Sequence, residues 1–236
     1  DRIATLSGPG YERGALSSGG SEAMEFAIKF VRQYVVATGQ PERRHLLTCQ
    51  PSYHGGTIAT LGMSGDEALG GFFDGFGMTS HKVLAPLTYR LPKPHTPESY
   101  ANLALDALEA KVQELGPNTV LAFAMEPVGG LATGCTVPLP AYFEGIREIC
   151  SRHGIFLIFD EVLCGTGRTG KFLNAHYYPD ALPDIVVMAK GLGSGYAPLG
   201  ATLFPADLVD HLSTLTGFSF SHTYNANPIT CATGLA

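Results

Sequence analysis

Two acids and one amine of this sequence stand where an α/β protein places its reactive groups. Glu126, Asp160 and Lys190 each follow an apolar run that is typical of a buried strand. Ligands bind at the carboxyl ends of the strands in open α/β sheets, because the loops of one edge gather there. We therefore expect the three side chains to converge on a ligand site. A lone acid and amine would favour a structural salt bridge, but three strand ends in register favour the site.

The segment IFDE ends one of these runs on two adjacent acids, Asp160 and Glu161. A buried charge is costly unless something pairs with it. We expect a cationic partner nearby, and the residues alone leave open whether it is a metal, a side chain or a ligand.

Glycines mark two further candidate segments. Residues 18–21, SGGS, precede a helical pattern, so their N–H groups are expected to face an anion such as a phosphate at the positive end of the helix dipole. An ordinary N-cap is an equally good interpretation of that segment alone. In residues 190–200, KGLGSGYAPLG, glycines let the backbone approach something flat or bulky. Tyr53 is a candidate aromatic face, although a lone tyrosine is more often part of the core.

An alternation of strands and helices is predicted to position these groups. Apolar residues recur at helical spacing in residues 22–39, 97–115 and 140–153, and apolar runs predict strands at 45–49, 120–125, 155–159 and 185–188. Residues 62–96 lack a clear period and are predicted to be irregular. This order predicts one α/β domain, with a mostly parallel sheet covered by helices on both faces.

Composition excludes several classes of protein. The chain has 236 residues, 45% of them hydrophobic, and a formal net charge of −6. No basic stripe is present to bind nucleic acid. No apolar stretch is long enough to span a membrane, and the first residues lack the pattern of a signal peptide. The five cysteines are scattered and odd in number, which predicts reduced thiols and a cytoplasmic protein.

Competing motifs are incomplete. Residues 165–170, GTGRTG, match a dinucleotide-binding pattern, but no helical period follows them. The chain has no GxxxxGK segment followed by Ser or Thr, and no GxSxG segment. His54, His176 and His222 are isolated in the sequence, so we predict no metal site.

A phosphate cradle, an aromatic plate, a carboxylate and a strand-end lysine are the parts needed to hold pyridoxal phosphate. The segments SSGGSEAMEFAIKFVR, SYHGGT, EPVGG, FDEVLCGTGRTGK, AKGLGSGYAPLGA and SHTYNANP, in this order, resemble the class III (omega) aminotransferases of the type I pyridoxal phosphate fold. The resemblance extends from one end of the chain to the other.

The resemblance implies catalytic roles for three residues. Lys190 would form a Schiff base with the cofactor and then move the proton between the substrate Cα and the cofactor. Asp160 would pair with the pyridine nitrogen and keep it protonated, so that the ring absorbs the electrons of a substrate carbanion. Glu126 would lie near the ring hydroxyl and the amino group in transfer.

The other matched positions would hold the cofactor. Val162 would pack on one face of the ring and Tyr53 on the other. Further cofactor contacts are expected from Gly19, Gly20, Ser21 and His54, the first three at the phosphate. Gly19 stands where the family more often has serine, which would loosen the cradle without removing a required group.

The resemblance also bears on assembly and on length. Thr223 matches a residue that reaches a phosphate in the partner subunit, which implies a homodimer with shared active sites. Family members continue at both ends, so we expect residues 1–236 to be a cofactor-binding large domain without the N-terminal segment and the C-terminal small domain.

The implied function is a pyridoxal phosphate-dependent aminotransferase. It would move an amino group from an amino acid or amine donor to a keto acid or aldehyde acceptor by a ping-pong mechanism. An aminomutase or a racemase on the same scaffold is the enzymatic alternative, because both use the same cofactor contacts. A catalytically idle interaction module is the alternative of another class.

Overall fold

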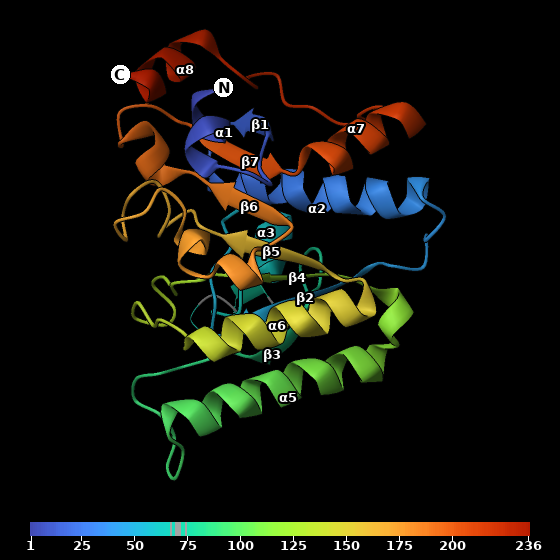
Figure 1. Cartoon of the computed structure of the whole chain (residues 1–236), viewed down its shortest axis with the longest axis vertical. Coiled ribbons are helices and arrows are strands. Elements are labelled where there is room, and N and C mark those ends of the chain that lie inside the picture. The colour runs from blue at the N-terminus through green and yellow to red at the C-terminus, as the bar shows by residue number, and fades with distance from the viewer. Residues whose placement is uncertain (67, 69–71, 74) are drawn as a thin grey trace.

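The computed structural model describes residues 1–66, 68, 72–73 and 75–236, and it is built around one seven-stranded sheet of order β1-β7-β6-β5-β4-β2-β3 (Figure 1). Neighbouring strands from β3 through β2, β4 and β5 to β6 pair in parallel, whereas β7 pairs antiparallel with both β6 and β1. The strands are β1 (Arg13–Ser17), β2 (His45–Gln50), β3 (His81–Leu84), β4 (Val120–Met125), β5 (Phe156–Asp160), β6 (Ile185–Met188) and β7 (Gly200–Phe204).

Helices cover both faces of this sheet. The long helix α2 packs across β7, β6, β5 and β4 on one face, and α5 and α6 pack side by side on the other (Figure 1). The α-helices are α1 (Arg2–Ser7), α2 (Gly20–Ala37), α3 (Ile58–Met63), α5 (Pro97–Leu115), α6 (Pro140–His153), α7 (Ala206–Leu215) and α8 (Pro228–Leu235). Short 3-10 turns are η1 (Pro117–Thr119), η2 (Asn174–Tyr177), η3 (Pro179–Ala181) and η4 (Lys190–Gly193).

The central strands are buried on both faces, which explains their continuous apolar sequences. Successive side chains of a strand point to opposite faces. Ile158 of β5 therefore packs in the core under α2, whereas Leu157 and Phe159 pack in the core under α5 and α6. The same alternation directs Asp160 to the α2 side of the sheet and Glu161 to the other side.

Arg43 closes the opposite, amino-terminal edge of the sheet. Its buried guanidinium donates to the backbone oxygens of Pro117, Val120 and His153 and to the side chain of Gln40, at 2.7–3.3 Å. These bonds join the start of β4 to the end of α6. The buried guanidinium of Arg43 thus holds together the amino-terminal edge of the sheet.

The structure confirms the predicted α/β architecture and most of its elements. The helices predicted at 97–115 and 140–153 and the strands predicted at 120–125 and 185–188 have the expected bounds. Thr96 and Ser99 form a capping box at the start of α5. The strand predicted at 155–159 is shifted by one residue, so Asp160 is the last residue of β5 instead of the first after it.

The prediction that residues 62–96 are irregular is wrong in part. They contain the end of α3 and the edge strand β3, which pairs in parallel with β2. The predicted irregularity of residues 67, 69–71 and 74 lies outside the described residues. β1 and β7, the antiparallel strands, were not predicted.

Candidate active site

One cavity of about 560 Å³ opens at the carboxyl edge of the parallel strands. It brings together residues that are far apart in the sequence, and these include Gly19, Gly20, Ser21, Tyr53, His54, Glu126, Asp160, Val162 and Lys190. Apolar residues complete the lining, among them Leu131, Leu163, Ala197, Pro198 and Leu199. The predicted convergence of the three strand ends is therefore present.

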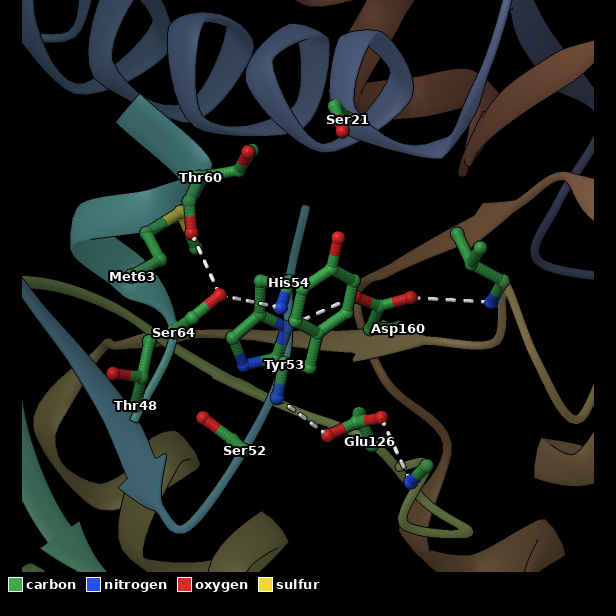
Figure 2. A network of polar contacts seen from close by, with 12 residues as sticks. Ser21, Thr48, Ser52, Tyr53, His54, Thr60, Met63, Ser64, Glu126 and Asp160 are labelled. Atoms are coloured by element: carbon green, nitrogen blue, oxygen red, sulfur yellow. Dashed lines mark hydrogen bonds and ion pairs between the residues drawn. The ribbon is translucent and has the colours of Figure 1, made fainter. Parts of the chain in front are cut away.

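Asp160 is buried in this cavity wall and is paired with a histidine. Its Oδ2 lies 2.9 Å from Nδ1 of His54, whose side chain is fully buried, and its Oδ1 accepts the N–H of Val162 at 3.1 Å. Figure 2 shows the contact between His54 and Asp160. The Asp160 carboxylate thus has a side-chain partner, and the imidazole fixes the direction in which the carboxylate points.

The other ring nitrogen of His54, Nε2, is buried and has no hydrogen-bond partner among the described residues. The backbone N–H of His54 donates to Oγ of Ser64 at 2.8 Å, and Ser64 in turn donates to the carbonyl of Thr60 in α3 (Figure 2). The loop after β2 is therefore anchored to α3. Sequence reasoning did not find Ser64, because nothing in its neighbourhood distinguishes it from other serines.

Glu126 follows β4 directly and holds two loops at once. Its Oε2 accepts the N–H of Tyr53 at 2.9 Å (Figure 2), and its Oε1 accepts the N–H of Gly130, also at 2.9 Å. Burial raises the pKa of the Glu126 carboxyl above its ordinary value, against the lowering effects of His54 and of the two N–H donors. Gly130 belongs to the EPVGG segment, whose paired glycines were the available signal for its place in the wall.

The glycine-rich start of α2 forms one wall of the cavity. A Cβ on Gly20 would lie 2.8 Å from Cγ1 of Val162, so this close approach requires glycine. Oγ of Ser21 accepts the N–H of Gly56 at 3.0 Å, which ties the helix to the loop after β2. The first N–H groups of a helix lack intrahelical partners, so this wall offers donors at the positive end of a dipole.

Lys190 is the first residue of η4, in the connection from β6 to β7. Its backbone adopts the left-handed conformation with φ of 42°, which is uncommon outside glycine. Across the described residues, no hydrogen bond or ion pair involves its ammonium group, and the side chain is exposed to the cavity. The amine is therefore available to a ligand.

Two predictions fare differently. Thr223 is exposed in a turn between α7 and α8 and does not line the cavity, so within one chain it is not part of the site. Glu161, the second acid of the pair, has backbone donors instead of a cation: Asn174 and Ala175 donate to its carboxylate at 2.5 and 2.8 Å. The expectation of a cationic partner is wrong for Glu161.

The model of the family "Aminotransferase class-III" matches residues 2–236 of the chain. The chain belongs to the class III aminotransferase family. An aminotransferase of Gibberella zeae is 39% identical over 227 residues, which are 93% of this chain and 44% of that protein. The putrescine–pyruvate aminotransferase of Pseudomonas aeruginosa is 34% identical over 235 residues, 99% of this chain and 51% of the relative.

Solved structures agree with this class III aminotransferase assignment. An (S)-enantioselective omega-transaminase from Thermomicrobium roseum superposes with a TM-score of 0.89 at 37% identity, over 99% of this chain and 52% of that one. An amine transaminase from an uncultivated Pseudomonas species, solved in its pyridoxal phosphate-bound form, gives 0.87 at 38% identity, over 94% and 51%. These structures confirm the predicted type I fold, and the chain spans about half the length of the relatives it matches.

Membrane-spanning helices and metal-binding clusters are both absent from the described residues. None of the helices there has the length and apolar character needed to cross a membrane. No cluster of three or more His, Cys, Asp or Glu side chains suited to a metal ion occurs in the same part of the chain.

Proposed function

We propose that this chain is the cofactor-binding half of a pyridoxal phosphate-dependent aminotransferase. The observation that carries the proposal is the cavity itself. In it a lysine amine without a partner among the described residues and a buried aspartate lie together with the donor-rich start of α2. Membership of the class III family supports the same function.

The residues of the cavity suit a phosphorylated aromatic aldehyde. The ammonium of Lys190 is a polar group of the wall that lacks a partner among the described residues. A Cβ on Gly19 would meet nothing within 4 Å, so open space lies beside this backbone, which suits close approach of a phosphate to backbone N–H groups. Gly19, Gly20 and Ser21 would hold the phosphate, Tyr53 and Val162 the two faces of the ring, and Lys190 the aldehyde end.

When bound, pyridoxal phosphate supplies an aromatic ring that accepts electrons from the substrate carbon. Asp160, oriented by His54, would hold a proton on the ring nitrogen, because an adjacent carboxylate favours the charged form of a base. Lys190 would take the proton from the substrate Cα and return it, acting as general base and acid. Glu126 would orient the amino group in transfer while it keeps the loops of Tyr53 and Gly130 in place.

Spectroscopy of the purified chain tests cofactor binding. We expect pyridoxal phosphate to give a visible absorption band that borohydride bleaches and that Lys190→Ala abolishes. Lys111→Ala is a matched control, because Lys111 lies on α5 and its ammonium contacts Glu114 outside the cavity. A Lys190→Ala chain with an unchanged band would refute the role of Lys190, and a colourless wild-type chain would support the idle module.

Nitrogen tracing tests the reaction. With a ¹⁵N-labelled amino donor and a keto acid or aldehyde acceptor, we expect the label to appear in the acceptor product. Label that stays within the donor carbon skeleton would instead indicate the aminomutase or racemase. Because the chain spans about half the length of the matched relatives, the assay is run on the longest form of the protein that the gene encodes.

We further propose that two chains form a cytoplasmic homodimer with shared sites. Support for the dimer is the exposure of Thr223 outside its own cavity, because the resemblance assigns this residue to a partner's phosphate. Support for the cytoplasm is that all five cysteines are free thiols. Sedimentation should give twice the chain mass, and Thr223→Ala should weaken pyridoxal phosphate binding in the dimer. A monomer that binds the cofactor with unchanged affinity in Thr223→Ala would refute the shared site.

A further inference from the structure

Glu161 is a buried acid for which the proposed reaction has no use. Its side chain is 0% exposed and points away from the cavity, to the face opposite Asp160. In the ion pairs of the described residues Glu161 does not occur. Burial, with a smaller contribution from the charge of the adjacent Asp160, raises the pKa of its carboxyl to about 7, although two N–H donors act in the opposite direction. Burial of an ionisable group is unfavourable, so other contacts must offset its cost.

The carboxylate of Glu161 fastens the end of β5 to the turn η2. Its two oxygens accept the N–H groups of Asn174 and Ala175 at 2.5 and 2.8 Å, and its own N–H donates to the carbonyl of Val187 in β6 at 2.8 Å. Both the backbone and the side chain of Glu161 are therefore fixed. Asp160, the preceding residue, must then present its carboxylate to the cavity.

The same carboxylate closes the loop of residues 162–173. The loop leaves at Glu161 and returns at Asn174, and Gly165 folds back so that its N–H donates to the carbonyl of Glu161 at 2.9 Å. A Cβ on Gly165 would lie 2.8 Å from that carbonyl oxygen and 3.2 Å from Oε2 of Glu161. The loop is thus packed directly on the glutamate.

The far side of this loop supports the residue after Lys190. A Cβ on Gly191 would lie 3.3 Å from Cβ of Thr166, so Thr166 packs against the backbone of η4. Thr166 is itself held in the left-handed conformation, with φ of 58°, and its N–H donates to the carbonyl of Phe172 at 2.7 Å. A shift of the 162–173 loop would therefore displace the backbone of η4, which carries Lys190.

We propose that Glu161 is a positioning residue, which clamps the 162–173 loop and thereby fixes Asp160 on one side of the cavity and the Lys190 backbone on the other. The inference rests on the proposed function for its catalytic meaning, but its geometric part concerns the chain alone. Loss of the clamp would loosen the two residues assigned to opposite ends of the cofactor ring.

The test compares Glu161→Gln with Glu12→Gln. Glutamine keeps the size of the side chain but replaces one acceptor oxygen with an NH₂ group, which cannot accept from a backbone N–H. Glu12 is a matched control, because its carboxylate also accepts two backbone N–H groups, from Gly10 at 2.7 Å and Ala206 at 3.1 Å, and it lies outside the cavity. Glu161→Asp keeps the charge on a shorter side chain.

Hydrogen exchange of the purified chain without cofactor tests the clamp. In Glu161→Gln we expect faster amide exchange in residues 161–175 and also in residues 189–193, and in Glu12→Gln only near residues 10 and 206. Unchanged exchange in residues 189–193 would overturn the proposal. If Glu161→Gln does not fold, Glu161→Asp is measured instead, with the same segments expected to exchange faster.

Titration with pyridoxal phosphate tests the consequence for the site. At a temperature well below the melting point, Glu161→Gln should bind the cofactor about tenfold more weakly, the factor that corresponds to one charge-assisted hydrogen bond, with partial rescue in Glu161→Asp. A lower melting temperature with unchanged affinity and unchanged visible circular dichroism would show a merely structural role and overturn the proposal. If wild type shows no cofactor band, the proposed function fails, and the exchange experiment alone decides on the clamp.

Discussion

Replacement of Gly20 by alanine is the sharpest structural test of the site. The new methyl group would lie 2.8 and 2.9 Å from the two Cγ atoms of Val162, closer than carbon atoms pack. Valine is branched at Cβ and has little freedom to move aside. At the neighbouring Gly19 a Cβ would meet nothing within 4 Å, and the backbone is extended with φ of −178°. Gly19→Ala is therefore a matched control one residue away.

The expected loss follows from the overlap. Overpacking of this kind destabilises by about 1–3 kcal/mol. Alanine is the better helix former, and this offsets the loss by about 0.5–1 kcal/mol. We expect a net loss of about 1–2 kcal/mol and, for a chain of this size, a melting temperature lower by about 2–8 °C. Gly19→Ala should stay within about 0.5 kcal/mol of wild type.

Thermal unfolding of the chain without cofactor measures this difference. Val162→Ala in the Gly20→Ala background removes the overlapping methyl groups, so the double variant should be more stable than the sum of the two single changes predicts, by about 0.5–3 kcal/mol. Two results would contradict this reasoning: equal melting temperatures for Gly20→Ala and Gly19→Ala, or additive changes in the free energy of unfolding at positions 20 and 162. Either would mean that the start of α2 does not approach Val162 as described, and the proposed phosphate cradle would lose its support.

Three further changes probe the site, α3 and the fold in turn. Asp160→Asn should still bind pyridoxal phosphate but should slow amino transfer by about 100-fold or more in a single-turnover assay, since it cannot hold a proton on the ring nitrogen. Burial lowers the pKa of Lys82 from 10.5 to about 8, so the unfolded chain binds more protons between these values and wild-type stability rises with pH there; Lys82→Met should remove this rise in urea unfolding at pH 8–10. Arg43→Met should lower the free energy of unfolding by about 3 kcal/mol, because one buried and two partly buried carbonyls lose their charged donor.

Each of these changes has an outcome that contradicts its reasoning. Full activity in Asp160→Asn would remove its assigned role at the ring nitrogen. An unchanged alkaline slope in Lys82→Met would mean that the ammonium, which contacts Thr48 and the carbonyls of Gly62 and Met63, is no less favourable there than in water. An Arg43→Met variant as stable as wild type would show that the amino-terminal edge does not need the guanidinium.

The parallel part of the fold was predictable because its signals are local. Long helices such as α5 carry a cap, a first-turn proline and an apolar stripe, and the buried parallel strands are apolar throughout. β3 was not predicted because it is a short edge strand, HKVL, with a lysine in its middle. β7, GATLF, was missed because it follows a glycine-rich loop and its pairing with β6 reverses direction.

The site shows the same division between sequence signals and tertiary contacts. Glu126, Asp160 and Lys190 were found because strand ends converge, and the start of α2 because its glycines precede a helical period. The pairing of His54 with Asp160 joins residues 106 positions apart, and no spacing in the sequence could indicate it. Ser64 and the Glu161 clamp were missed for the same reason, since both act through backbone N–H groups, which every residue has.

The reversal of direction at β7 limits how Lys190 can move. The connection that carries the lysine leaves β6 and re-enters the sheet in the neighbouring strand, so both of its ends are hydrogen-bonded to each other across one strand spacing. Anchoring at both ends restricts movement of this connection as a whole. The range of positions open to the amine is then determined mainly by rotation about the bonds of its own side chain, which has four methylene groups.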